Sequence, residues 1–115
     1  MEKRKTNHLT VAQQVKRDNI LVEYLCNHKG AENAASKHDI ASYLEAQGYQ
    51  QKTKGVGELI GRIAKQRHLP ICSINGKGYY WPVSKAELQA TIADLESRIA
   101  ALTEHIDRLK MFLPE

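Results

Sequence analysis

The stretch Leu69–Pro82, LPICSINGKGYYWP, decides the fold of this chain. Residues 71–74 and 79–81 are two short runs of the residue types that favour strands. The polar and glycine-rich segment 75–78, NGKG, separates them, and Asn-Gly between such runs is the strongest short-range signal for a hairpin. Pro82 then closes the second run, because proline cannot donate to a strand ladder. The sequence therefore predicts a β-hairpin over residues 71–81.

A long amphipathic helix is predicted directly after the hairpin. Ser84 and Glu87 have the spacing of a capping box, and the helix that they open can continue to about Leu113. Apolar residues then recur in alternating steps of four and three without a gap: Leu88, Ile92, Leu95, Ile99, Leu102, Ile106, Leu109 and Leu113. With Ile92 at heptad position a, isoleucine dominates the a positions and leucine fills the d positions, which favours a parallel two-stranded coiled coil. We therefore expect a homodimer.

Two questions about this helix stay open at the level of sequence. Part of the apolar stripe can fold back onto the body instead, and Leu88 and Ile92, nearest the hairpin, are expected to do so. The e and g positions carry no strong charge code, so they do not choose between parallel and antiparallel pairing. A parallel pair holds two bodies at one end and suits a palindromic site, whereas an antiparallel pair separates them.

Upstream of the hairpin the apolar spacing indicates three helices. Thr10 and Gln13 can form a capping box at the start of the first helix, which runs to about His28 or restarts at Asp18. Gly30 is expected to supply its left-handed cap.

The second and third predicted helices follow after short loops. The second begins at Ser36 as N-cap and stops at Gly48. The third ends near His68, and its inward face is formed by Val56, Leu59, Ile60 and Ile63.

Three helices, a hairpin and a long helix are the order of elements in a winged helix-turn-helix protein. The hairpin with its GKGYY unit and the capped helix after it resemble small winged-helix proteins of bacteriophages and prophages, over about residues 16–100. The resemblance implies a mainly α fold with a small β-hairpin (α+β). The order of elements along the chain indicates a basic arm (1–9), a winged-helix domain (10–83) and a dimerisation helix (84–115). The resemblance also implies a DNA-binding protein in the cytoplasm of a bacterial host cell.

The charge distribution supports a polyanionic partner for the body only. Residues 1–85 contain 14 Lys and Arg against 7 Asp and Glu, a net charge of +7. Residues 86–115 contain 3 against 6, a net charge of −3. A basic body beside an acidic segment is typical of proteins whose body binds nucleic acid.

In a helix-turn-helix the second helix of the motif enters the major groove, and the wing reaches an adjacent backbone or groove. Placing the third helix there directs Arg62, Lys65 and Gln66 towards DNA, where Arg reads guanine and Gln reads adenine. Phosphate contacts are expected at the helix entrance and at the hairpin tip. These candidates are Lys52, Thr53, Lys54 and Lys77.

Two features of the third helix weigh against a simple recognition helix. Glu58 can pair with Arg62 one turn later and withdraw it from the groove. Gly57 and Gly61 weaken the helix and form a smooth face, which suits close packing of a neighbouring helix as well as DNA. The aromatic residues 79–81 are expected to pack within the protein rather than stack on bases.

No catalytic constellation stands out, so we expect a protein that is not an enzyme and has no cofactor. Cys26, His28, His68 and Cys72 form the one conceivable metal set, but their spacings are atypical of zinc sites, and we expect none. Free thiols, no signal peptide and no membrane span are expected of a cytosolic chain. The function predicted is double-stranded DNA binding by a phage or prophage transcriptional regulator or replication accessory. The alternative is a phage-encoded interaction module that binds and inhibits a host protein complex.

Overall fold

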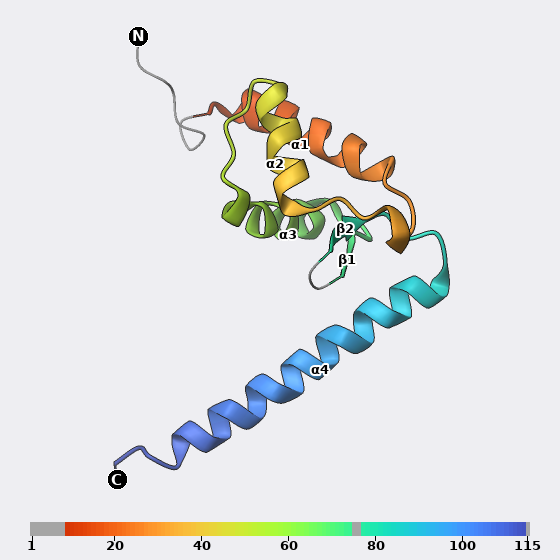
Figure 1. The fold of residues 1–115 in the computed structure, drawn as a ribbon. Coiled ribbons are helices and arrows are strands. Elements are labelled where there is room, and N and C mark those ends of the chain that lie inside the picture. Colours follow the sequence, from red (N-terminus) through yellow and green to blue (C-terminus); the bar gives the residue numbers. More distant parts are fainter. Residues whose placement is uncertain (1–8, 75–76, 115) are drawn as a thin grey trace.

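Figure 1 shows the computed structural model, which describes residues 9–74 and 77–114, as a helical body from which one long helix extends. The protein is mainly helical with one small antiparallel sheet, which confirms the α+β prediction. None of the helices in this part of the chain is long and apolar enough to cross a membrane. The elements in chain order are α1 (Val11–Cys26), η2 (Ala31–Asn33), α2 (Lys37–Ala46), η3 (Thr53–Gly55), α3 (Val56–Arg67), β1 (Cys72–Ile74), β2 (Gly78–Tyr80) and α4 (Lys85–Lys110).

Helix α1 begins as the sequence predicts and ends differently. Thr10 Oγ1 accepts from the Gln13 N–H at 3.1 Å, and the Gln13 side chain accepts from the Thr10 N–H at 2.9 Å, which confirms the capping box. The helix is continuous and ends at Cys26. The prediction that Gly30 caps it was wrong, because N–H bonds back to the carbonyls of residues 24 and 25 tighten the last turn first. Gly30 instead uses its positive φ of 86° to begin η2.

Helices α2 and α3 pack with α1 around a single core. Ser36 Oγ caps α2 by accepting from the Asp39 N–H at 3.0 Å, and the left-handed His68 ends α3. The inward face predicted for α3 is confirmed, since all four of its apolar residues are buried. The fully buried side chains of the helices are Leu21, Leu25, Ile40, Leu44, Val56 and Ile63.

The hairpin is one residue shorter at each outer end than predicted. β1 and β2 pair in register from Cys72 with Tyr80 to Ile74 with Gly78, while the Asn75-Gly76 turn lies outside the described residues. The segment between α1 and α2 lies along the free edge of β2. There the Ala35 N–H donates to the Tyr79 carbonyl at 2.8 Å, and the Tyr79 N–H donates back at 2.9 Å.

Gly78 permits this close approach of two backbones. Its φ is +139°, and a Cβ at this position would lie 1.9 Å from the carbonyl oxygen of Ala35. That separation is far below van der Waals contact, so the backbone of the segment before α2 and the backbone of β2 can meet only across a glycine. Gly78 therefore belongs to strand pairing rather than to the turn.

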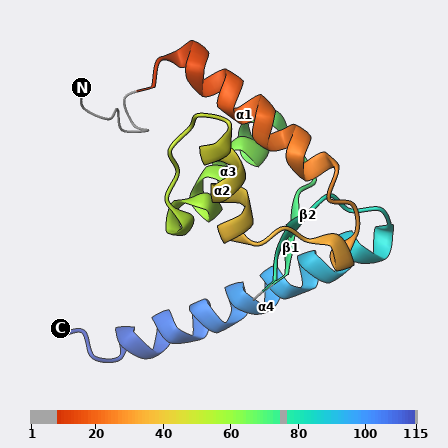
Figure 2. The ribbon, with the colours of Figure 1, turned by 45° about the horizontal axis from the view of Figure 1, so that its top comes forward.

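Glu87 determines how α4 leaves the body. Ser84 Oγ accepts from the Glu87 N–H at 3.2 Å, as in a capping box. The Glu87 carboxylate accepts from the Val83 N–H at 2.9 Å and from the Ala31 N–H, in η2, at 2.8 Å. One side chain thus joins the start of α4 to the loop after α1. Figures 1 and 2 show α4 running past the hairpin and on beyond the body.

Candidate nucleic-acid interface

The outward face of α3 carries the polar residues predicted to meet DNA. Burial of its four apolar residues leaves Arg62, Lys65 and Gln66 exposed on the other side of the helix. Glu58 is also exposed, and among residues 9–74 and 77–114 it does not approach Arg62 within ion-pairing distance. The guanidinium of Arg62 is therefore open to a partner.

The two glycines of α3 have different surroundings. A Cβ on Gly57 would lie 2.9 Å from the Tyr79 hydroxyl and 3.5 Å from Cε of Lys37, so the hairpin and α2 cover this position. Nothing lies within 4 Å of the corresponding point on Gly61. The close approach at Gly57 is thus made by a tyrosine side chain rather than by a packed helix, and the surface at Gly61 is open.

The entrance to α3 presents basic residues next to an uncapped helix start. Lys52, Thr53 and Lys54 are exposed in η3 and at its N-cap, and the chain passes directly from there into α3. The N-cap residue of α3 is Gly55, which has no side chain to accept from the first-turn N–H groups. The positive end of the helix dipole and the two lysines at this helix start favour an anion such as phosphate.

Two further basic side chains of the body have partners within the protein. Arg17 is buried, and its Nε lies 3.1 Å from Oδ1 of Asp18. Arg67 of α3 donates to Oδ1 of Asn19 in α1 at 2.8 Å. Because Arg17 is buried and Arg67 is half-buried with a partner in another helix, we assign both to the fold rather than to the interface.

Lys77 lines a cleft together with basic residues that no sequence pattern had indicated as site residues. It is exposed at the start of β2 and lines a cleft with Lys37, His38 and Arg98. These residues come from the hairpin, the first turn of α2 and the fourth turn of α4. They are too far apart in the sequence for any local pattern to link them.

Of the three hairpin aromatics, Tyr80 is buried, while Tyr79 and Trp81 are half-buried. Tyr80 is 2% exposed and faces α4. Burial raises its pKa, and a side-chain hydrogen bond with Thr91 of α4 opposes that shift. Burial also raises the pKa of Tyr79, and the positive charge of Arg98 lowers it. Tyr79 and Arg98 line the same cleft.

The apolar stripe of α4 is uncovered along its whole length. The residues of α4 that lie beside β1 and Tyr80 are instead Ala86, Glu87, Ala90, Thr91 and Asp94. The prediction that Leu88 and Ile92 pack on the body was wrong, since they are 37% and 52% exposed. The stripe lies on the neighbouring side of the helix, and its members Leu95, Ile99, Leu102, Ile106 and Leu109 are 46% to 62% exposed.

Leu113 does not belong to the helix, contrary to the prediction. Helix α4 ends at Lys110, and residues 111–113 form turns. Leu113 precedes Pro114, whose ring disfavours the helical conformation of the residue before it and which has no N–H to donate. The apolar seam of the helix therefore extends from Leu88 to Leu109.

The cysteine and histidine residues that sequence analysis weighed as a metal set do not come together. Within the described part of the chain, no three His, Cys, Asp or Glu side chains form a group able to hold a metal ion. Cys26 is half-buried and Cys72 is buried, and both are free thiols. No family model, curated protein or solved structure matches this chain.

Proposed function

We propose that this chain is a DNA-binding protein with a winged helix-turn-helix body, related to those of bacteriophages and prophages. In this interpretation α2 and α3 are the helix-turn-helix, and the hairpin is the wing. The backbone pairing of Ala35 with Tyr79 supports it, because it adds a third extended segment, from between α1 and α2, to the edge of the hairpin. The sheet then holds the wing against the start of α2.

The observation that carries the proposal is the exposed face of α3. Arg62, Lys65 and Gln66 project from a helix whose other side is anchored in the core. A rigid helix with an arginine and a glutamine on its open face suits reading of guanine and adenine edges in a major groove. The basic entrance with Lys52 and Lys54, and Lys77 on the hairpin, suit phosphate groups on either side.

We also propose that two copies pair through α4. An uncovered apolar stripe on a helix that extends beyond its own body favours a partner helix, and Ile at a with Leu at d favours a parallel pair. Two bodies held at one end would present two α3 helices to a palindromic site. Such a protein fits the role of a small transcriptional regulator or replication accessory in the bacterial cytoplasm.

Replacing both Arg62 and Lys65 by alanine tests the assignment of α3. We expect the double variant to bind its DNA at least about 30-fold more weakly, because each lost contact to a base or phosphate costs about 1–3 kcal/mol. The measurement is a mobility-shift titration at fixed salt on a site selected from random duplexes. A control that removes the same charge elsewhere is Lys16→Ala with Lys29→Ala, both exposed outside α3. Equal affinity of the α3 variant and this control would refute the role given to α3.

A second candidate function is binding to a host protein complex. The observation that favours it is the continuous apolar face of α4, whose residues Ile99 and Leu102 are more than 60% exposed. A face of this kind also accepts a helix of another protein. Recovery of a specific host complex by the full chain, together with no DNA binding at low salt, would favour this function over DNA binding.

A further inference from the structure

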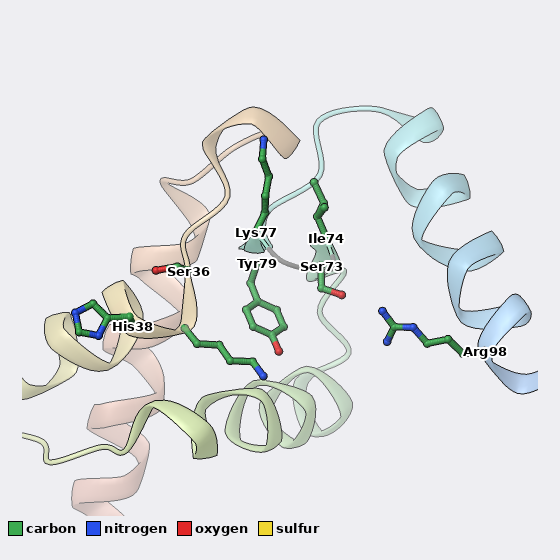
Figure 3. Close-up of a pocket in the computed structure, with 9 residues that line it drawn as sticks. Ser36, His38, Ser73, Ile74, Lys77, Tyr79 and Arg98 are labelled. Carbon is green, nitrogen blue, oxygen red and sulfur yellow. The ribbon is translucent and has the colours of Figure 1, made fainter. Parts of the chain in front are cut away.

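A basic cleft lies between the start of α2, the hairpin and α4. Its volume is about 460 Å³, and within the described residues no acidic side chain lines it. The charged or titratable side chains on its walls are Lys37, His38, Lys77 and Arg98. Basic residues of three separate elements thus line one space, and in Figure 3 Lys77 and His38 extend away from the Tyr79 hydroxyl and Arg98.

Two polar groups that line the cleft meet beside Gly57 of α3. The Tyr79 hydroxyl and Nζ of Lys37 lie 2.9 and 3.6 Å from the same point above Gly57, so they are close neighbours. In Figure 3 the Tyr79 ring points towards α3, and Arg98 points from α4 towards Ser73 and that ring. A hydroxyl and an ammonium therefore meet beside the first turn of α3, and the Arg98 guanidinium lines the same cleft from α4.

Backbone donors of α2 add to this arrangement. Ser36 Oγ accepts only from the Asp39 N–H, and the N–H groups of Lys37 and His38 come too early in the helix to reach a carbonyl within it. Donors at the start of a helix and side-chain cations around one space are the groups that bind phosphate oxygens.

We propose that this cleft binds a phosphate group of the DNA backbone, so that the duplex contacts α4 through Arg98 as well as the α2–α3 unit. The inference rests on the proposed DNA binding. Lys37 and Tyr79 line the cleft and also cover Gly57 of α3, so a strand that follows the exposed face of α3 comes within reach of it. Because Glu87 determines the direction of α4, it also determines whether Arg98 reaches that strand.

Replacement of Asp94 tests the proposal by an expected gain in DNA affinity rather than a loss. Its Oδ2 lies 2.9 Å from the Arg98 guanidinium, and both side chains are about half exposed. The carboxylate therefore competes with an incoming phosphate for Arg98 and repels it. Asp94→Asn removes that competition, and a residue that only supported the fold would not improve DNA binding when its partner is removed.

The experiment is a fluorescence-anisotropy titration of a labelled duplex with the full chain at several salt concentrations. Arg98→Gln and Lys37→Gln are each expected to weaken binding about 5-fold and to reduce the slope of log K against log salt by about 0.9 per chain. Asp94→Asn is expected to tighten binding about 2-fold. The matched control is Lys110→Gln, which removes one positive charge from the far end of α4 and should match the wild type.

The outcomes separate this inference from the proposed function. If Arg98→Gln and Lys37→Gln bind like the wild type while the Arg62 and Lys65 double variant is weakened, the cleft does not hold phosphate, and DNA binding through α3 stands. If the wild type does not bind the duplex even at low salt, both proposals fail. Lys37 lies outside α4, so its variant keeps the test decisive if a change at Arg98 disturbs pairing of that helix.

Discussion

Gly78→Ala will destabilise the body severely, lowering the free energy of unfolding by at least about 3 kcal/mol. The new methyl group would lie 1.9 Å from the Ala35 carbonyl oxygen, and the φ of +139° is itself unfavourable for alanine. The three nearest obstructing atoms, in Ala35 and Ser36, all belong to the backbone, so no side-chain rotation relieves the clash. The two hydrogen bonds between Ala35 and Tyr79 must break, and the segment before α2 must leave the sheet.

Thermal and denaturant unfolding, followed by circular dichroism, will measure this effect. The control is Gly61→Ala, because the space at Gly61 is open and the residue lies inside α3. Alanine there should raise the free energy of unfolding by about 0.5–1 kcal/mol, since it lowers the entropy of the unfolded chain and favours the helix. A Gly78→Ala variant as stable as the wild type would contradict the described approach of β2 to Ala35.

We expect Ile99→Asp to convert the proposed dimer to a monomer. Ile99 lies in the middle of the α4 stripe and is 62% exposed in the single chain, so the proposed seam is what covers it. A symmetric pair would place two carboxylates in that seam, and burial of unpaired charges costs several kcal/mol. We expect the dissociation constant of the dimer to rise at least about 100-fold, which corresponds to about 3 kcal/mol.

Sedimentation equilibrium of the full chain measures this change. The matched control is Ser97→Asp, which introduces the same charge two residues away at heptad position f, on the side of α4 opposite the seam. Ser97→Asp should sediment as the wild-type dimer. An Ile99→Asp protein that keeps the dimer mass would refute the seam, and a monomeric wild type would refute the pairing itself.

Local patterns in the sequence were sufficient for most elements of the fold. The caps at Thr10, Ser36 and Ser84 each depend on a side chain and an N–H three residues later, so their spacing is visible in the sequence. The inward face of α3 follows from helical periodicity in the same way. The end of α4 was misjudged because the apolar repeat continues through Leu113, although Pro114 prevents the helix from following it.

Contacts between distant segments could not be read from the sequence. Glu87 was recognised as a capping residue, but its bond to the Ala31 N–H joins positions 56 residues apart. Gly78 was taken for a turn residue, and only the approach of Ala35 shows why it must be glycine. The cleft residues Lys37 and Arg98 belong to no sequence motif. They line the same cleft because α4 runs past the hairpin.

The polar side of α4 explains why its apolar stripe is left open. Glu87 and Thr91 face the body, where they meet Ala31 and Tyr80. The apolar stripe lies on the neighbouring side, so the contacts that fix α4 to the body direct the stripe to solvent. The sequence pattern alone does not distinguish which side a helix turns towards its own body.

Salt-dependent binding of the wild-type chain to duplex DNA tests the central claim most directly. A dimer that places Lys52, Lys54 and Lys77 of each copy on phosphates makes about six such contacts, so its affinity should fall about 1000-fold between about 50 and 200 mM salt. Anisotropy of a labelled duplex measures both affinities. A fall of this size supports a paired DNA-binding protein, and an absence of binding at about 50 mM salt would contradict it.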